Sequence, residues 1–330
     1  MNSTRLQVRD AANPLLRILR NPEFRSYSGL ILVIIVVGFL ISLRNPNFLT
    51  QKNILNILRQ ISVYGILACG QAFAMMTGNI DLQMGSLAGL CGVVTCRTMV
   101  EAGVPLVAAA ALSMVIGAVV GLFSGFLIAK TDIPAFIMTL GMQIVLRGAT
   151  FLACNGKPIG NLPDYMLKLG VGTVLGIPIP ILFMLATFIV VGIILSLTTF
   201  GRAVYAVGGN RQAAHHSGIN SMKVIMFSFM ISGILSALAG VILSARNASA
   251  QPTAGNTFET EAIAACAMGG VAFTGGKGSV IGIFFGALLL GVINNGMNLL
   301  YISSYWQLVA KGVIIIGAVL YSLYTSARQK

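Results

Sequence analysis

Charged side chains are scarce in this sequence of 330 residues. Only 9% of the residues are charged and only eight are acidic, whereas 56% are hydrophobic. A soluble globular protein of this length needs far more polar surface than these residues can supply. The shortage excludes an ordinary soluble domain, and it favours a protein for which the lipid bilayer is the main solvent.

Patterns for catalysis and for metal binding are also missing. The five cysteines form no Cys-x-x-Cys pair, which argues against a metal centre or a redox pair. No HExxH or GxSxG motif occurs, and the stretch 276–278 lacks both the first glycine and the Ser or Thr of a phosphate-binding loop. We therefore expect no catalytic residue, metal or cofactor in this chain, and no ATP site.

Long apolar runs, in contrast, are abundant. A helix needs about 20 mainly apolar residues to cross a bilayer. Candidate segments lie at about 27–43, 61–77, 82–100, 104–129, 133–153, 177–197, 224–245, 262–274, 280–302 and 305–324. The run 262–274 is short enough to be a half-span, which leaves nine or ten crossings. The predicted fold class is all-α: a polytopic transmembrane helical bundle of about ten spans, with residues 29–325 as its membrane domain.

Basic residues flank the apolar runs and suggest an orientation. Because Lys and Arg are enriched on the cytoplasmic side of membrane proteins, we expect a cytoplasmic N-terminal tail over residues 1–28. An even number of crossings then places a short C-terminal tail, 326–330, on the same side. The net charge of +13 is spread between the spans, which favours topology signals over nucleic-acid binding. The tail contains Arg5, Arg9, Arg17, Arg20 and Arg25.

Glycine is frequent, with 38 residues, and several glycines recur at helical spacing. Such small residues allow membrane helices to approach closely, so we expect contact stripes at Gly85/Gly89, at Gly117/Gly121/Gly125 and at Gly278/Gly282/Gly286. The pattern Gly-Ser-x-x-Gly begins at both 85 and 278. An internal repeat, with broken helices at corresponding positions, is one explanation, and chance in a glycine-rich chain is the other.

Polar side chains within or beside the apolar runs are candidates for a solute path. Amides both donate and accept hydrogen bonds and would suit a neutral hydroxylated solute, but the same residues could simply tie helices together. No carboxylate lies plainly at the centre of a span, which weakens the case for an ion-coupled carrier. Gln143 and Arg147 are four residues apart, so we expect them on one helix face. The candidates are Asn79, Asp81, Gln83, Gln143, Arg147, Asn294 and Asn298.

The longest expected cytoplasmic loop covers residues 198–223. It contains Gly-Gly-Asn, then a helix-prone Gln-Ala-Ala, then Ser-Gly-Ile-Asn, which predicts a short surface helix between two turns. Such an element could dock a cytoplasmic partner or serve only as a capped connector.

Five segments with recognisable patterns follow one another along the chain: GNIDLQMGSLAG, IPAFIMTLGMQIVLRG, FGRAVYAVGGNRQAAHHSGIN, SAQPTAGNTFETEAIAACAMGG, and GGKGSVIG with GVINNGMNLL. Taken in this order, they resemble the permease subunits of ribose-type ATP-binding-cassette importers for carbohydrates. The resemblance extends from about residue 50 to 320. Asn79 and Gln83 depart from the Gly-Gly-Ile-Asp-Leu-Ser pattern that is usual in this family.

This resemblance implies a multi-pass protein of the bacterial inner membrane that imports a ribose-like sugar. Its expected partners are a cytoplasmic ATPase subunit, an extracytoplasmic sugar-binding protein and a second permease copy, identical or related. The stretch QAAHHSG is similar to the short EAAxxxG coupling motif of other importer permeases, with Gln212 in place of the acid. The residues that the resemblance assigns to ATPase coupling are Gly201, Arg202, Tyr205, Gly208, Gly209, Asn210, Ala213, Ala214 and Gly218. The alternative is a secondary carrier or facilitator that acts without an ATPase.

Overall fold

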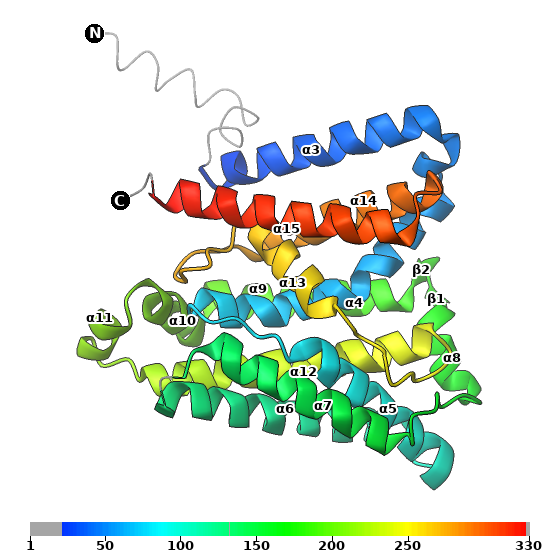
Figure 1. Cartoon of the computed structure of the whole chain (residues 1–330), viewed down its shortest axis with the longest axis horizontal. Coiled ribbons are helices and arrows are strands. Elements are labelled where there is room, and N and C mark those ends of the chain that lie inside the picture. Colours follow the sequence, from blue (N-terminus) through cyan, green and yellow to red (C-terminus); the bar gives the residue numbers. More distant parts are fainter. Residues whose placement is uncertain (1–21, 132, 328–330) are drawn as a thin grey trace.

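The computed structural model describes residues 22–131 and 133–327, so most of the expected N-terminal tail and the last three residues lie outside it. Long helices run roughly along one direction and form a bundle (Figure 1). The helices are α3 Pro22–Arg44, α4 Gln51–Met76, α5 Met84–Ala102, α6 Leu106–Thr131, α7 Ala135–Ala153, α8 Asp164–Val171, α9 Ile179–Leu197, α10 Thr199–Gly209, α11 Arg211–His216, α12 Ser221–Arg246, α13 Phe258–Met268, α14 Val280–Leu299 and α15 Ser304–Ala327, and the 3₁₀ helix η1 spans Pro46–Leu49.

The prediction of an all-α polytopic membrane protein is confirmed, but the count of ten spans is not. Within the described residues, seven helices are long and apolar enough to cross a membrane: α3, α4, α6, α7, α9, α12 and α14. The other three expected segments are the helices α5, α13 and α15. The short segment expected at 262–274 is the 11-residue helix α13, Phe258–Met268, which is too short to cross alone.

The glycine ladder of α6 packs directly against α12. A Cβ atom placed on Gly117 or Gly121 would collide with the backbone carbonyls of Gly233 and Phe229, and one on Gly125 would lie 2.9 Å from the Cα atom of Met226. Because only glycine permits this approach, the predicted contact stripe is confirmed. It holds α6 against α12, and each of these helices has 26 residues.

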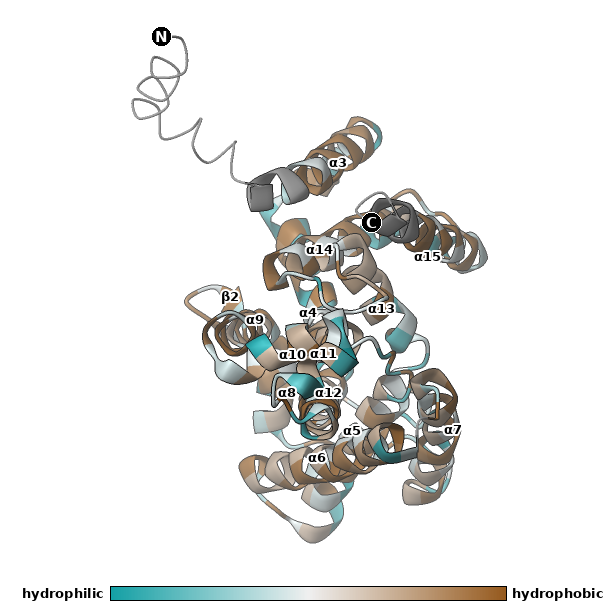
Figure 2. Ribbon diagram, turned by 90° about the vertical axis from the view of Figure 1, so that its left-hand side faces the viewer, coloured by the Kyte–Doolittle hydropathy of each residue, from teal (hydrophilic) through white to brown (hydrophobic). Residues whose placement is uncertain are grey.

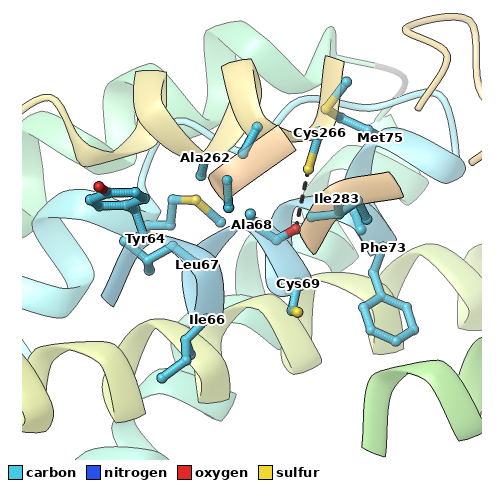
Figure 3. Close-up of a cluster of buried hydrophobic side chains, with 14 of the residues drawn as sticks. Tyr64, Ile66, Leu67, Ala68, Cys69, Phe73, Met75, Ala262, Cys266 and Ile283 are labelled. Carbon is cyan, nitrogen blue, oxygen red and sulfur yellow. Dashed lines mark hydrogen bonds between the residues drawn. The ribbon is translucent and has the colours of Figure 1, made fainter. Parts of the chain in front are cut away.

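Helix α4 lies at the centre of the bundle. In its membrane-spanning segment 83% of the residues are buried, compared with 11% in α3 at the periphery. Figure 2 shows the mainly hydrophobic α3, α6, α7 and α15 around the outside. In Figure 3, side chains of α4 pack beneath α13, and the Cys266 thiol lies 3.2 Å from the carbonyl oxygen of Ala68. All five cysteines are buried and free, as expected of packing residues.

The two ends of the bundle differ. Helix α8 and a two-stranded antiparallel hairpin, β1 Thr173–Val174 and β2 Ile177–Pro178, lie at one end (Figure 1). Helices α10 and α11 lie at the opposite end, on the same side as the end of α15. The region of α8 and the hairpin is therefore separated from α10 and α11 by the length of the bundle.

Candidate functional site

Two helices begin next to each other inside the bundle. The start of α5 contacts the turn before α13, since a Cβ atom on Gly85 would meet the carbonyl oxygen of Gly255 and the Glu259 carboxylate. The Glu259 carboxylate also accepts a hydrogen bond from Gln143 Nε2 at 3.0 Å. Gln143 is near the midpoint of α7, Ala135–Ala153. The starts of α5 and α13 therefore meet at the depth of the middle of a membrane-spanning helix.

Arg147, one turn beyond Gln143 on α7, holds the irregular chain that leads into α13. Its Nη1 donates to the carbonyl oxygens of Pro252 at 2.9 Å and Ala254 at 2.8 Å. These carbonyls accept no hydrogen bond within a helix. A charged donor such as Arg147 gives them stronger hydrogen bonds than a neutral donor would. The expectation that Gln143 and Arg147 share one helix face is confirmed: Gln143 contacts the first turn of α13, and Arg147 contacts the segment before it.

Asp81 and Gln83 lie in the connection between α4 and α5, where both are buried. The Asp81 carboxylate accepts from Ser232 Oγ at 2.7 Å and from the Gln83 backbone N–H at 3.1 Å. The Gln83 side-chain oxygen accepts from Ser124 Oγ at 2.8 Å. Ser124 belongs to α6 and Ser232 to α12, so these bonds attach the α4–α5 connection to both helices. In this structure Asp81 and Gln83 therefore hold helices together. Asn79 is half-buried and donates to Thr77 Oγ1 at 3.0 Å within the same connection.

The two remaining path candidates lie elsewhere, on α14. Asn298 accepts a hydrogen bond from Gln307 Nε2 at 2.9 Å near the start of α15. The side-chain oxygen of Asn294 is buried without a hydrogen-bond partner in the described structure. Its neighbour Asn295, which the sequence reasoning missed, exchanges two hydrogen bonds with Asn53 of α4, at 2.9 and 3.0 Å. The seven candidates thus do not form one cluster.

A row of exposed polar side chains was also missed. It lies in the segment 251–260, the polar stretch that precedes the short apolar run, and that change of composition was its only sequence signal. Two carboxylates of this region point inward instead: Glu259 meets Gln143, and Glu261 pairs with Lys311 of α15 at 2.5 Å. The exposed residues are Gln251, Thr253, Asn256, Thr257 and Thr260.

The loop 198–223 forms two short helices whose ends are capped by side chains. Asn210 Oδ1 accepts from the backbone N–H of Ala213 at 2.9 Å at the start of α11, and Asn220 Oδ1 accepts from that of Lys223 at 3.0 Å at the start of α12. The predicted short surface helix between turns is therefore confirmed as α11, and α10 precedes it. Such caps fix the direction in which each helix begins.

One face of this two-helix unit is anchored to the bundle. Gly208 lies against the Met76 carbonyl and the Gly276 backbone, where a Cβ atom could not fit, and Tyr205 Oη donates to the Gly278 carbonyl at 3.0 Å. Arg211 Nη2 donates to the carbonyl of Ala129 at the end of α6, at 3.2 Å. Gly201 and Ala214 are buried. The unit is therefore attached to α4, α6 and the α13–α14 connection.

The opposite face is free. Arg202, Gly209, Asn210, Ala213 and Gly218 are exposed. A hollow of about 780 Å³ opens between α11 and the start of α12, and it is lined by Arg211, Gln212, His215, His216, Gly218, Ile219, Asn220, Ser221 and Met222. An anchored inner face and an open outer face suit an element that transmits movement.

Known proteins resemble this chain over most of its length. Residues 53–319 match the family described as branched-chain amino acid transport system / permease component. A ribose import permease protein of Haemophilus influenzae is 44% identical over 93% of this chain and 95% of its own, and that of Bacillus subtilis is 43% identical over 91% and 92%. A D-allose transport system permease protein of Escherichia coli is 36% identical over 89% and 90%. No solved structure matches the chain.

These similarities include the helices that build both the α5–α13 junction and the α10–α11 unit. The family match alone covers more than half of the chain, and the relatives are matched over almost their whole length. The chain therefore belongs to the branched-chain amino acid transport system / permease component family, and within it to the ribose-type permeases of ATP-binding-cassette importers.

Proposed function

We propose that this protein is the membrane-spanning permease subunit of an ATP-driven importer for a ribose-like monosaccharide. The observation that carries the proposal is the 41–44% identity to ribose import permeases over at least nine-tenths of the chain. Permeases named for allose, arabinose and xylose also match, at 32–36% identity. The solute class is therefore a neutral sugar of five or six carbons, with ribose the first to test.

The free face of α10 and α11 is the proposed docking site of a separate cytoplasmic ATPase subunit. Its anchored face contacts α4, α6 and the connection to α14, so movement of the unit would be passed to several membrane helices. Sugar would cross by alternating access, in which ATP binding and hydrolysis in the partner shift the bundle between two arrangements. This assignment places α10, α11 and both chain termini in the cytoplasm.

Two further partners complete the proposed importer. An extracytoplasmic binding protein would deliver the sugar at the end that carries α8 and the β-hairpin, and a second permease copy would form the other wall of the path. Two copies give the ATPase two docking elements, which ATP binding in the partner could draw together. The inner membrane is the corresponding location.

Reconstitution distinguishes this function from that of a carrier acting alone. Proteoliposomes that contain the permease, its ATPase and its binding protein should accumulate D-ribose only when ATP is supplied on the ATPase side. Liposomes that contain the permease alone should take up no ribose under a proton, sodium or sugar gradient. Gradient-driven uptake by the permease alone would identify a secondary carrier and overturn the proposal.

A further inference from the structure

We infer that the segment 251–260 lines the solute path and forms a neutral hydrogen-bonding wall for a polyhydroxylated solute. This inference rests on the proposed function, because it assigns the surface that the sugar contacts. It moves the path away from Asp81 and Gln83, because the Asp81 carboxylate and the Gln83 side-chain oxygen are hydrogen-bonded within the bundle.

The segment lies deep in the membrane. Its depth follows from its contacts with α7, a helix long enough to span the bilayer. Gln143, near the midpoint of α7, bonds to Glu259, and Arg147, one turn away, bonds to the carbonyls of Pro252 and Ala254. Since α7 is itself apolar and long enough to span, residues 252–259 lie close to the depth of its middle.

The backbone before α13 is irregular at this depth. Gly255 and Thr257 have positive φ angles of 72° and 66°, and turns occupy the whole stretch from 252 to 257. Within the hydrocarbon layer, a non-helical backbone is tolerated only where it is buried in protein or lines a water-filled space. The side chains of Thr253, Asn256 and Thr257 are exposed, so the protein does not cover this segment completely. Water, and not lipid, is therefore its solvent.

The composition of the wall specifies the chemistry of the solute. Its exposed groups are the amides of Gln251 and Asn256 and the hydroxyls of Thr253, Thr257 and Thr260, all of which are uncharged. Hydroxyls and amides both donate and accept hydrogen bonds, so they pair with sugar hydroxyls that act as donors and with those that act as acceptors.

The carboxylates of the region are turned away from the wall. Glu259 bonds to Gln143, and Glu261 pairs with Lys311. An anionic or cationic solute would find no exposed opposite charge within the segment, whereas a neutral polyol would find only groups that it can bond.

Contacts behind the wall hold it in place. The Arg147 guanidinium clamps two of its carbonyls, and α5 approaches closely enough that a Cβ atom on Gly89 would lie 2.7 Å from the Ala254 oxygen. Exposed side chains on a braced backbone present fixed hydrogen-bonding positions. Because these groups are already ordered, a sugar can bind to them weakly without the path having to close around it.

Cysteine accessibility tests the inference directly, because all five native cysteines are buried. We expect T253C, N256C and T260C, each made in the full chain in native membranes, to react with a charged, water-soluble methanethiosulfonate reagent. The matched control is Val119→Cys, at the middle of α6, where the native side chain is 59% exposed on the apolar outside. A lipid-facing thiol stays protonated and out of reach of the reagent, so this variant should react at least tenfold more slowly.

Equal labelling rates at the wall positions and at V119C would overturn the inference. Labelling requires neither ATP nor partners, so it can be read even if reconstituted transport fails, which separates this inference from the proposed function. In the complete importer, Asn256→Leu should lower D-ribose uptake about tenfold with the ATPase still co-purifying, while Val119→Leu should transport normally. Uptake by N256L equal to that of V119L would show that the segment is wet but does not contact the sugar.

Discussion

Arg147 shows how one side chain supports an irregular backbone inside a membrane protein. Its two bonds, of 2.9 and 2.8 Å, satisfy carbonyls that no helix serves. Hydrogen bonds from charged donors contribute about 1.5–3 kcal/mol each, and a buried acceptor left without a partner is costly. Arg147→Met should therefore lower the free energy of unfolding by about 3 kcal/mol, measured as thermal stability in detergent. Arg147→Lys retains a cationic donor and should recover part of the loss; equal stability of R147M and the native chain would contradict the role.

Lys311 and Glu261 form an ion pair between α15 and α13, with side-chain exposures of 28% and 8%. Removal of one partner leaves a charge in poorly solvating surroundings, which typically costs about 3–5 kcal/mol in a fully buried pair and less here because Lys311 is partly exposed. We expect Lys311→Met to destabilise the protein by about 2 kcal/mol in a thermal unfolding assay. The exchange E261K with K311E should restore part of this stability. A double variant no better than K311M would show that the pair is not what joins α15 to α13.

The residue-level predictions from sequence succeeded where spacing on one helix was enough. Gln143 and Arg147 are four residues apart on α7, so their shared direction followed from helical geometry alone. The partners of Asp81 could not be foreseen, because Ser232 is 151 residues away and reaches it only through the packing of α12. The exposed row at 251–260 was missed because exposure is a property of the assembled bundle. Its individual residue types are ordinary for a polar loop.

At the scale of elements, the α6–α12 contact depends on glycine. Gly121→Ala would place a Cβ atom on the Phe229 carbonyl, and neither backbone can yield easily. We expect this substitution to lower the thermal midpoint markedly, with a loss of about 2–3 kcal/mol by analogy with overpacked cores. Gly148 on α7 is the matched control, because nothing lies within 4 Å of its Cβ position. Gly148→Ala should be neutral or slightly stabilising, because alanine has the higher helix propensity. Similar losses for both variants would mean that the contact with the Phe229 carbonyl is not the cause of the destabilisation.

Two adjacent glycines lie on opposite faces of the α10–α11 unit, Gly208 on the anchored face and Gly209 on the exposed face. Gly208 is wedged against Met76 and Gly276, whereas nothing lies within 4 Å of the Cβ position of Gly209. Gly209→Trp, and likewise Arg202→Glu, should leave thermal stability unchanged but reduce co-purification of the ATPase at least tenfold. Gly208→Ala should instead destabilise the permease itself. Normal ATPase binding and transport by both G209W and R202E would disprove the docking assignment.

Element boundaries were predicted well for the long spans and poorly for the broken ones. Each of the ten apolar runs overlaps a helix, although the run 262–274 extends beyond the end of α13 at Met268, because continuous apolar length is a local property of the sequence. Helix α13 begins at Phe258, four residues before the expected start, since its first turn contains Glu259 and Glu261, which no hydropathy pattern would place in a membrane. Their partners, Gln143 and Lys311, come from other helices. Tertiary contacts therefore determined that boundary.

At the scale of the whole molecule, α13 decides how the chain alternates across the membrane. It covers only 11 residues, about 16 Å, and the irregular segment before it descends from the end of α12 to the middle of α7. Together the two make one complete crossing, with the segment 247–257 as its outer half and α13 as its inner half. Helix α14 then starts at the α10–α11 end, as Tyr205 bonding to Gly278 requires.

This reading predicts that both termini face the cytoplasm. If α13 and the segment before it count as one crossing, the described helices α3, α4, α5, α6, α7, α9, α12, α13, α14 and α15 return the chain to its starting side, and the end of α15 lies at the α10–α11 end of the bundle (Figure 1). A tag after Lys330 should be cleaved by protease only after the inner membrane is permeabilised, like a tag before Met1. A tag in the α8 and β-hairpin region, at Gly176, should be cleaved in intact spheroplasts. Cleavage of the Lys330 tag in intact spheroplasts would mean that α13 does not complete a crossing, and it would move the wall at 251–260 away from the path.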